Sequence, residues 1–198
     1  MSTLSVDKIE PVGSTLTLGE SGDTVTIPVG GTFTNNGAAT GFAAGSTHAS
    51  QWRLTTDFTG SADPITSNLE EVDAPVGFGV LGGSMVLGAG TGVFTFPVTG
   101  YWSITAFGGF DGFTLAGAVA EIYIYTTADN SVYTIAAKGF GGVYYADNTA
   151  VCSYIMDVTD VTQCKVRFRV YQASGSVTTR GDTALNETFF TFNRLADT

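Results

Sequence analysis

The chain has 198 residues, of which 43% are hydrophobic and only 13% are charged, and its net charge is −10. This composition excludes intrinsic disorder, which goes with low hydropathy, and argues against nucleic-acid binding, which needs clustered Lys and Arg to neutralise phosphates. No apolar run reaches the roughly 18 residues that span a bilayer, and the first ten residues lack the basic and apolar regions of a secretory signal, so we expect neither membrane insertion nor a signal peptide.

The most frequent residues favour strands over helices. The chain contains 26 Gly, 14 Phe and 8 Tyr, and Thr and Val are abundant. Glycine and β-branched residues disfavour helices, whereas β-branched and aromatic residues are typical of strands. With so few charges, a monomer would expose apolar patches that subunit interfaces normally cover. We therefore expect an all-β, obligately oligomeric protein.

The N-terminal part of the chain shows short alternations of polar and apolar residues. They occur at residues 14–18, 24–27 and 32–34, with Gly- and Asn-rich turns between them. Each predicted strand is too short to bury a face by itself. We interpret residues 13–49 as an extended β-stem in which several chains complete one another's sheets; a flexible Gly/Thr linker is the alternative. The apolar positions of the predicted stem are Leu16, Leu18, Val25, Ile27 and Phe33.

Residues 50–198 predict a β-sandwich or jelly roll. No window shows a helical period, and strands recur every 8–15 residues with turns between them. The predicted strands cover residues 92–98, 101–107, 121–126, 132–137, 150–156, 163–171 and 187–194. In the first of these, Phe94 and Phe96 share one face, which we expect to point into the core.

Three motifs in this region resemble the heads of the complement-globular-head and tumour-necrosis-factor superfamily. GVFTFPVTGYWSI at residues 92–104 resembles its "G-x-F-T-x-P-x-x-G-x-Y" strand–turn–strand. MDVTDVTQCKV at residues 156–166 resembles its late "L-x-x-G-D-x-V" hairpin, with Thr159 where the family usually has Gly, and TFFTFNRL at residues 188–195 resembles its closing strand. The resemblance covers about 145 residues and implies a homotrimeric jelly-roll knob with aromatic residues around a threefold axis.

The first residues are similar to a different group of proteins. MSTLSVDKIEP at residues 1–11 and STLTLGESGDTVTIP at residues 14–28 resemble the start of structural and fibre proteins of marine tailed bacteriophages. This resemblance implies a virion protein with an attachment end at residues 1–12, a trimeric β-stem at residues 13–49 and a knob at residues 50–198. The apolar residues of the attachment end, its candidate virion contacts, are Leu4, Val6 and Ile9.

No residue pattern in the chain predicts catalysis. His48 is the only histidine, has no Cys or carboxylate close to it in sequence, and is interpreted as a solvated linker residue. Cys152 and Cys164 are predicted on neighbouring strands, where they could form a disulfide across a hairpin or stay reduced in the host cytoplasm. We expect no catalytic residue, no metal and no cofactor.

Two acidic groups and one tripeptide are interpreted as surface features. Residues 70–73 hold three carboxylates and residues 157–160 hold two; paired carboxylates could bind calcium or hydrolyse glycosides, but a solvated loop is the simpler interpretation. Residues 180–182 spell Arg-Gly-Asp, an integrin-binding string that recurs by chance and suits a turn.

The most informative charges lie on one predicted strand. Lys165, Arg167 and Arg169 alternate with apolar residues and therefore share one face, and they are three of only eight basic residues. This face could bind anionic glycans or phosphates, pair with carboxylates of a neighbouring subunit, or solubilise an outer strand.

These features together predict a non-enzymatic structural protein of a tailed-bacteriophage virion, assembled in the host cytoplasm. In the fibre interpretation, a homotrimer attaches by its N-terminus to other virion proteins, and its knob binds a host-surface glycan or protein with the avidity of three copies. The alternative is a capsid decoration or head-fibre protein held by its N-terminal arm. An enzyme such as a depolymerase is the third class, but the sequence shows no carboxylate-lined groove.

Overall fold

The computed structural model describes residues 46–77, 79–112, 119–141, 147–173 and 177–198, together with the single residues 26, 29 and 31. Nearly all of these belong to the unit Ala43–Thr198. The predicted attachment end, with Leu4, Val6 and Ile9, lies outside the described residues. So do the stem positions Leu16, Leu18, Val25, Ile27 and Phe33.

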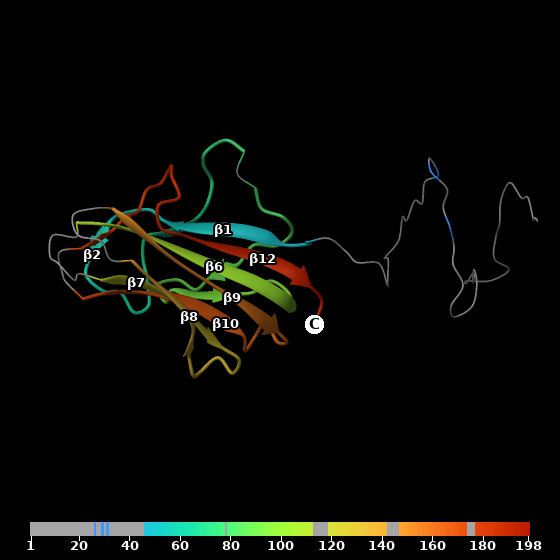
Figure 1. Ribbon diagram of the computed structural model, residues 1–198. Helices are drawn as coiled ribbons and strands as arrows, with labels where there is room; N and C mark the ends of the chain where they lie inside the picture. The colour runs from blue at the N-terminus through green and yellow to red at the C-terminus, as the bar shows by residue number, and fades with distance from the viewer. Residues whose placement is uncertain are drawn as a thin grey trace, which may run out of the picture. The chain divides into compact units, whose positions relative to one another are not determined.

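The described chain contains strands and no helix, and every strand pair is antiparallel (Figure 1). One sheet has seven strands, β2 (Phe58–Thr59), β11 (Thr178–Thr179), β6 (Gly100–Asp111), β12 (Phe189–Ala196), β1 (Ala49–Leu54), β3 (Leu69–Glu71) and β9 (Asn148–Val158). The other has five, in the order β4 (Val86–Leu87), β5 (Val93–Thr95), β10 (Lys165–Gln172), β7 (Ala120–Thr127) and β8 (Thr134–Gly141). No helix of the described part is long and apolar enough to cross a membrane.

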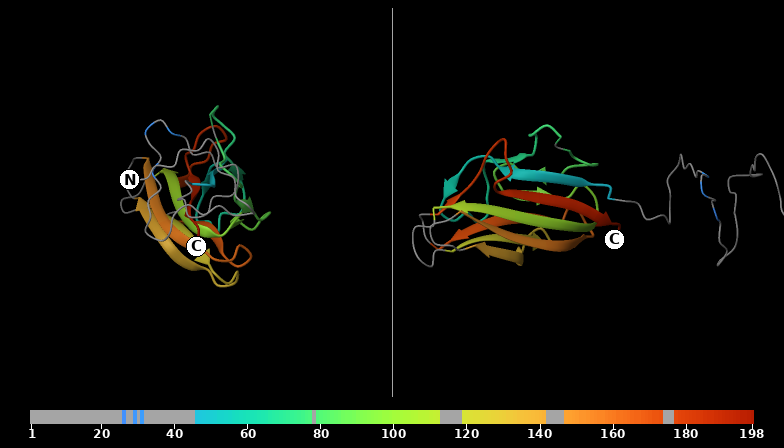
Figure 2. Two further views of the ribbon diagram at one scale, coloured as in Figure 1. Left: turned by 90° about the vertical axis from the view of Figure 1, so that its right-hand side faces the viewer. Right: turned by 45° about the horizontal axis from the view of Figure 1, so that its top comes forward.

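The two sheets face each other as the layers of a sandwich (Figure 2). Strand β6 is central to the seven-stranded sheet: β9 pairs with one edge along almost its whole length, while β12 and then β11 pair with the other. Burial alternates strictly along β6, because every second side chain of a strand points to the same face. This alternation makes one side of the sheet core and the other side an outer surface.

The core is aromatic and lies between the sheets. Phe94 of β5 is fully buried and its ring lies 5.3 Å from Trp52, 5.6 Å from Phe168 and 5.5 Å from Phe192, measured between centroids. Each buried Phe contributes about 1.5–3 kcal/mol through removal of apolar surface from water. The expectation that Phe94 and Phe96 face the core is confirmed, although the strand itself is shorter than the predicted residues 92–98.

Strands β8 and β9 close one side of the sandwich although they belong to different sheets. A side-chain carbon placed on Gly139 of β8 would overlap the carbonyl oxygen of Val151 on β9 and lie 2.6 Å from its carbonyl carbon. Only glycine fits between two backbones this close. We call this contact the β8–β9 seam; Cys152 lies buried beside it.

The described chain begins and ends at the same end of the sandwich. The backbone N–H of Arg194 donates to the carbonyl of His48 at 2.9 Å, and the Ser46 hydroxyl donates to the Arg194 carbonyl at 3.0 Å. We call this the near end, and the opposite end, where β6 finishes at Asp111, the far end. The interpretation of His48 as a solvated linker residue is wrong: it is half-buried and its ring lies 5.9 Å from that of Trp102.

Candidate functional site

Two outer faces and one polar cleft are features of the sandwich that could interact with other molecules. The first face is the outer side of the five-stranded sheet, where strand pairing brings basic and aromatic side chains together. Arg167 lies opposite Tyr125 and Arg169 opposite Tyr123 in the β10–β7 register. We call this surface the arginine–tyrosine face and define it by Tyr123, Tyr125, Tyr133, Arg167, Arg169 and Tyr171.

Each arginine of this face lies between two aromatic rings. The Arg167 guanidinium carbon is 4.4 Å from the ring centroid of Tyr133 and 5.3 Å from that of Tyr125. The Arg169 guanidinium is 5.1 Å from Tyr123 and 5.5 Å from Tyr171. Cation–π attraction of this kind contributes about 0.5–1 kcal/mol per contact at a surface and fixes the planes of the guanidinium groups.

A second set of contacts surrounds these stacked arginines. The Tyr125 hydroxyl accepts a hydrogen bond from Arg169 Nη1 at 3.0 Å. The Tyr123 hydroxyl donates to Glu121, which also lies 3.7 Å from the ammonium of Lys138. Burial and then the hydrogen bond to Glu121 raise the pKa of Tyr123 to about 12, so this phenol stays neutral at physiological pH.

The predicted basic face is therefore only partly exposed. Arg167 and Arg169 keep 27% and 26% of their side-chain surface in contact with solvent. Lys165, in contrast, is buried between β5 and β7, and its ammonium donates to the carbonyl of Val161 at 2.6 Å. Arg167 and Arg169, and not Lys165, are thus the basic residues of this strand that other molecules can reach.

The acidic run at residues 70–73 is more than a solvated loop, because two of its partly exposed carboxylates neutralise a buried arginine. Arg53 is completely buried; its Nε donates to Glu70 at 2.7 Å, its Nη2 to Asp73 at 2.7 Å and its Nη1 to the carbonyl of Ala74 at 2.9 Å. These contacts have the length of charge-assisted hydrogen bonds. Arg53 thus fastens β3 and the loop after it to β1, a structural role that the sequence analysis missed.

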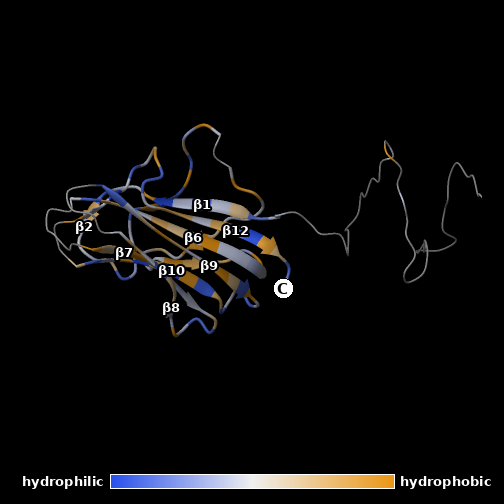
Figure 3. Cartoon of the chain, viewed as in Figure 1, coloured by the Kyte–Doolittle hydropathy of each residue, from blue (hydrophilic) through white to orange (hydrophobic). Residues whose placement is uncertain are grey.

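The outer side of the seven-stranded sheet is the second face, and the residues at its centre carry no charge. The middle of β6 is coloured orange to white in Figure 3, away from the hydrophilic end of the scale. Its side chains alternate with core residues on three paired strands. We call it the uncharged face and define it by Tyr101, Ser103, Thr105 and Phe107 of β6, Val151, Ser153 and Ile155 of β9, and Phe189, Thr191 and Asn193 of β12.

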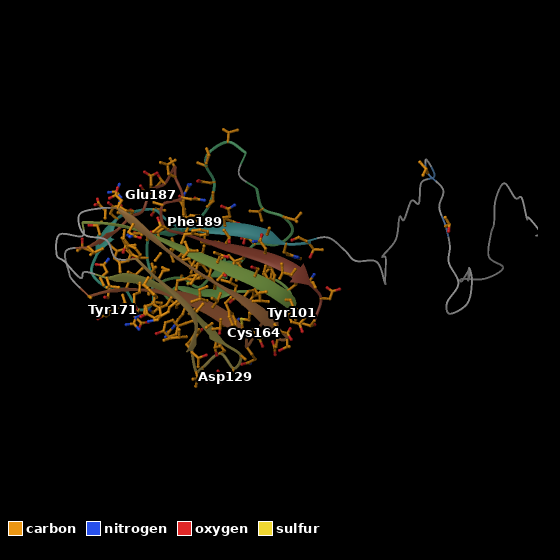
Figure 4. All side chains as sticks on the ribbon, viewed as in Figure 1. Tyr101, Asp129, Cys164, Tyr171, Glu187 and Phe189 are labelled. Atoms are coloured by element: carbon orange, nitrogen blue, oxygen red, sulfur yellow. The ribbon has the colours of Figure 1, made fainter. Side chains whose placement is uncertain are left out.

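Several apolar side chains of the uncharged face are open to solvent. Ile155 is 59% exposed, Val151 47% and Tyr101 41%, and the rings of Phe107 and Phe189 stack with centroids 4.3 Å apart. Figure 4 labels Tyr101 near one end of this sheet and Phe189 toward the other. An outer sheet surface with exposed apolar residues and no central charge is typical of a protein–protein interface.

The polar cleft lies at the far end and surrounds Arg180. It has a volume of about 530 Å³ and is lined in part by Asp111, Asp147 and Glu187. Arg180 lies 3.5 Å from Glu187, 3.3 Å from Asp57 and 3.7 Å from Asp111, and the carboxylates of Glu187 and then Asp57 raise its pKa further.

The Arg-Gly-Asp tripeptide at residues 180–182 is thereby engaged within the molecule. The Gly181 N–H donates to Asp57 at 2.8 Å, and the Asp182 carboxylate accepts the N–H groups of Ala184 and Leu185 at 2.6 and 2.9 Å. The turn interpretation fits Asp182, which accepts hydrogen bonds from the bend that follows it, whereas Arg180 and Gly181 are held by contacts with acidic residues distant in the chain.

The two cysteines do not face each other across a hairpin. Cys152 lies on β9 and Cys164 directly precedes β10, and these strands belong to different sheets. Both thiols are free and buried, and burial raises the pKa of Cys152 to about 11. In the part of the chain that the structure describes, no three His, Cys, Asp or Glu side chains group as metal ligands do.

Known proteins are similar to this chain in fold but give no match to its sequence. No family profile matches the sequence, and no curated protein matches it. The crystal structure of murine APRIL at pH 5.0 superposes with a TM-score of 0.54 at 9% identity, covering 75% of this chain and 98% of that chain. Eiger TNF from S. frugiperda superposes with a TM-score of 0.53 at 12% identity, covering 76% of this chain and 93% of that chain. These similarities confirm the predicted all-β jelly-roll sandwich.

Proposed function

We propose that this protein is a non-enzymatic structural subunit of a tailed-bacteriophage virion, a homotrimer that is attached by its N-terminal segment and presents its jelly-roll knob for binding to the host surface. The uncharged face carries the proposal, because self-association is its simplest explanation. A subunit interface that covers Ile155 and Val151 removes from water the most exposed apolar groups of this face. Three copies, rather than two, is what the resemblance of the knob to tumour-necrosis-factor-like heads implies.

The positions of the chain ends support a knob that points away from its attachment. The described chain begins at the near end, beside the last strand, so the segment that precedes it leaves from that end. In this proposal the far end, with β2, β11 and the Arg180 cleft, is the end presented to the host surface. The virion assignment itself rests on the resemblance of residues 1–28 to phage fibre proteins.

The capsid decoration protein stays the second candidate. It uses the same trimer and the same N-terminal attachment, and differs only in the virion part that the N-terminal segment binds. The fold is compatible with both, so the location of the protein on the particle decides between them.

Gold-labelled antibodies against the knob, applied to intact phage particles and viewed by electron microscopy, test the proposal. Label confined to the tail supports the fibre interpretation, and label spread over the head supports the decoration interpretation. Expression in the infected cell without any label on purified particles would refute the virion role in both forms.

A further inference from the structure

Arg167 and Arg169 are the two partly exposed arginines of the arginine–tyrosine face. They have fewer hydrogen-bond partners than Arg53, which donates to two carboxylates. Arg53 donates one hydrogen bond from each of its three nitrogens, at 2.7–2.9 Å. Among the described residues, Arg167 donates no hydrogen bond and Arg169 donates one, to Tyr125. The Nε atoms of both are buried without a hydrogen-bond partner in the described structure. Because these Nε atoms are buried, an added anion reaches the two arginines through the solvent-exposed part of each side chain, which is held in a fixed plane.

One carboxylate already lies between these two arginines. Asp63 approaches Arg169 Nε at 3.4 Å and Arg167 Nη2 at 3.9 Å, which is longer than the 2.7–2.9 Å of a charge-assisted hydrogen bond. Its side chain is 45% exposed, so the contact is open to water. Asp63 therefore marks where an anion sits without satisfying the arginines that hold it.

The backbone around Asp63 is fixed against the edge of β10. Ala62 and Val170 exchange two backbone hydrogen bonds of 2.9 Å, and Ile65 N–H donates to the Phe168 carbonyl at 2.9 Å. The segment thus continues the sheet where β5 ends, and only the Asp63 side chain has to rotate to clear the two guanidinium groups.

The surroundings of the pair favour a sugar acid over other anions. Tyr171, beside Arg169, is 39% exposed, and an aromatic ring of this kind offers a surface on which the C–H face of a pyranose can lie. The carboxylate of Asp63 shows which anion the two arginines already accept. The net charge of −10 repels any polyanion, an acidic polysaccharide included, so binding here depends on local geometry.

We propose that Arg167 and Arg169 form a carboxylate-binding site for uronic-acid units of an acidic polysaccharide, and that Asp63 occupies this site as an internal competitor in the free protein. This site specifies a ligand class for the host-surface binding proposed above, and its biological use rests on that proposal. Three copies in a trimer bring three such sites to one polymer chain, which raises the apparent affinity without new contacts.

Titration calorimetry of the full chain with oligogalacturonate at low salt tests this site, with a neutral maltooligosaccharide as the comparison ligand. We expect binding of the acidic probe and none of the neutral one. Asp63→Asn removes the competitor and should tighten binding about two- to fivefold, as expected for loss of a solvent-exposed ion pair. Asp57→Asn changes the net charge equally but at Arg180, and should leave the affinity unchanged.

Substitution of the arginines tests geometry without changing charge. Arg169→Lys and Arg167→Lys keep the cation but lose the planar fork, and each should weaken binding about tenfold. Equal tightening by Asp63→Asn and Asp57→Asn, or unaltered affinity in both lysine variants, would refute the site. Equally tight binding of polyglutamate would refute a polysaccharide as its ligand. Because each site lies within one subunit, a chain that binds the probe yet sediments as a monomer would refute the trimer and leave the site standing.

Discussion

The replacement Gly139→Ala tests whether the β8–β9 seam closes the sandwich. The added carbon would overlap the carbonyl oxygen of Val151 and lie 2.6 Å and 2.9 Å from its carbonyl carbon and its nitrogen. All three atoms belong to the backbone of a long strand, so no side chain can rotate to make room. Either β8 or β9 has to shift, and we expect the seam to open.

The cost follows from the size of this overlap. Forcing one carbon into a filled site costs about 1–3 kcal/mol, and the entropy that alanine removes from the unfolded chain offsets less than 1 kcal/mol of it. We expect a loss of about 2 kcal/mol in the free energy of unfolding, which lowers the melting temperature by about 4–8 °C for a domain of this size. Gly79→Ala is the matched control, because nothing lies within 4 Å of a carbon placed there.

Urea denaturation measures the free energy, and thiol labelling measures the opening directly. The thiol of Cys152 lies beside the seam and donates to the Ile122 carbonyl at 3.6 Å, so it should react faster with a disulfide reagent in Gly139→Ala. Cys164, which is 1% exposed, should react as slowly as before. Equal stability and equal labelling in the Gly139→Ala and Gly79→Ala variants would show that β8 and β9 are not held this close.

Two further substitutions test local electrostatics. Arg53→Met should destabilise the fold by about 2–3 kcal/mol in urea denaturation. This is less than the loss of one partner of a fully buried ion pair costs, because the side chains of Glu70 and Asp73 are 31% and 72% exposed and regain water. A change below about 0.5 kcal/mol would contradict the role of Arg53 in fastening β3 to β1. The Asp129 carboxylate accepts hydrogen bonds from the Val132 N–H and the Thr127 hydroxyl, which lower its pKa. Its stabilising effect is therefore present above the unfolded-state pKa and is lost as pH falls below it. Asp129→Asn keeps the acceptor oxygen without the titration, so its unfolding free energy should fall less steeply between about pH 4 and 2; an unchanged slope would assign acid sensitivity to other groups.

Sequence patterns predicted the sandwich because its long strands alternate. Strands β6, β7, β9, β10 and β12 each overlap a predicted strand. Burial follows the expected period of two along β6 and in most of β9, β10 and β12, whereas residues 122–127 of β7 are all buried. Strands β2, β3, β4 and β11 escaped prediction because two or three residues carry no period, whereas the three-residue β5 lies within a longer predicted alternation. Pairing of Thr178 with Asp111, for example, depends on a distant part of the chain.

The interaction surfaces were predicted less completely than the fold. Alternation placed Arg167 and Arg169 on one face, but their stacking depends on the β10–β7 register, which a single sequence does not reveal. Arg53 was missed for a similar reason, since its partner Glu70 lies 17 residues away in the chain. A charged residue in a strand gives no sign of burial until its partners are placed.

Self-association through the uncharged face is the central claim, and sedimentation equilibrium of the full chain tests it most directly. We predict three times the mass of one chain at micromolar concentration. Ile155→Asp should dissociate the trimer, because burying the exposed 59% of each isoleucine contributes roughly 1–2 kcal/mol per subunit and an aspartate there opposes burial. Leu185→Asp, at a residue 60% exposed in a loop outside this face, should leave the mass unchanged. A wild-type chain that sediments as a monomer, or a trimer that Ile155→Asp leaves intact, would contradict the account.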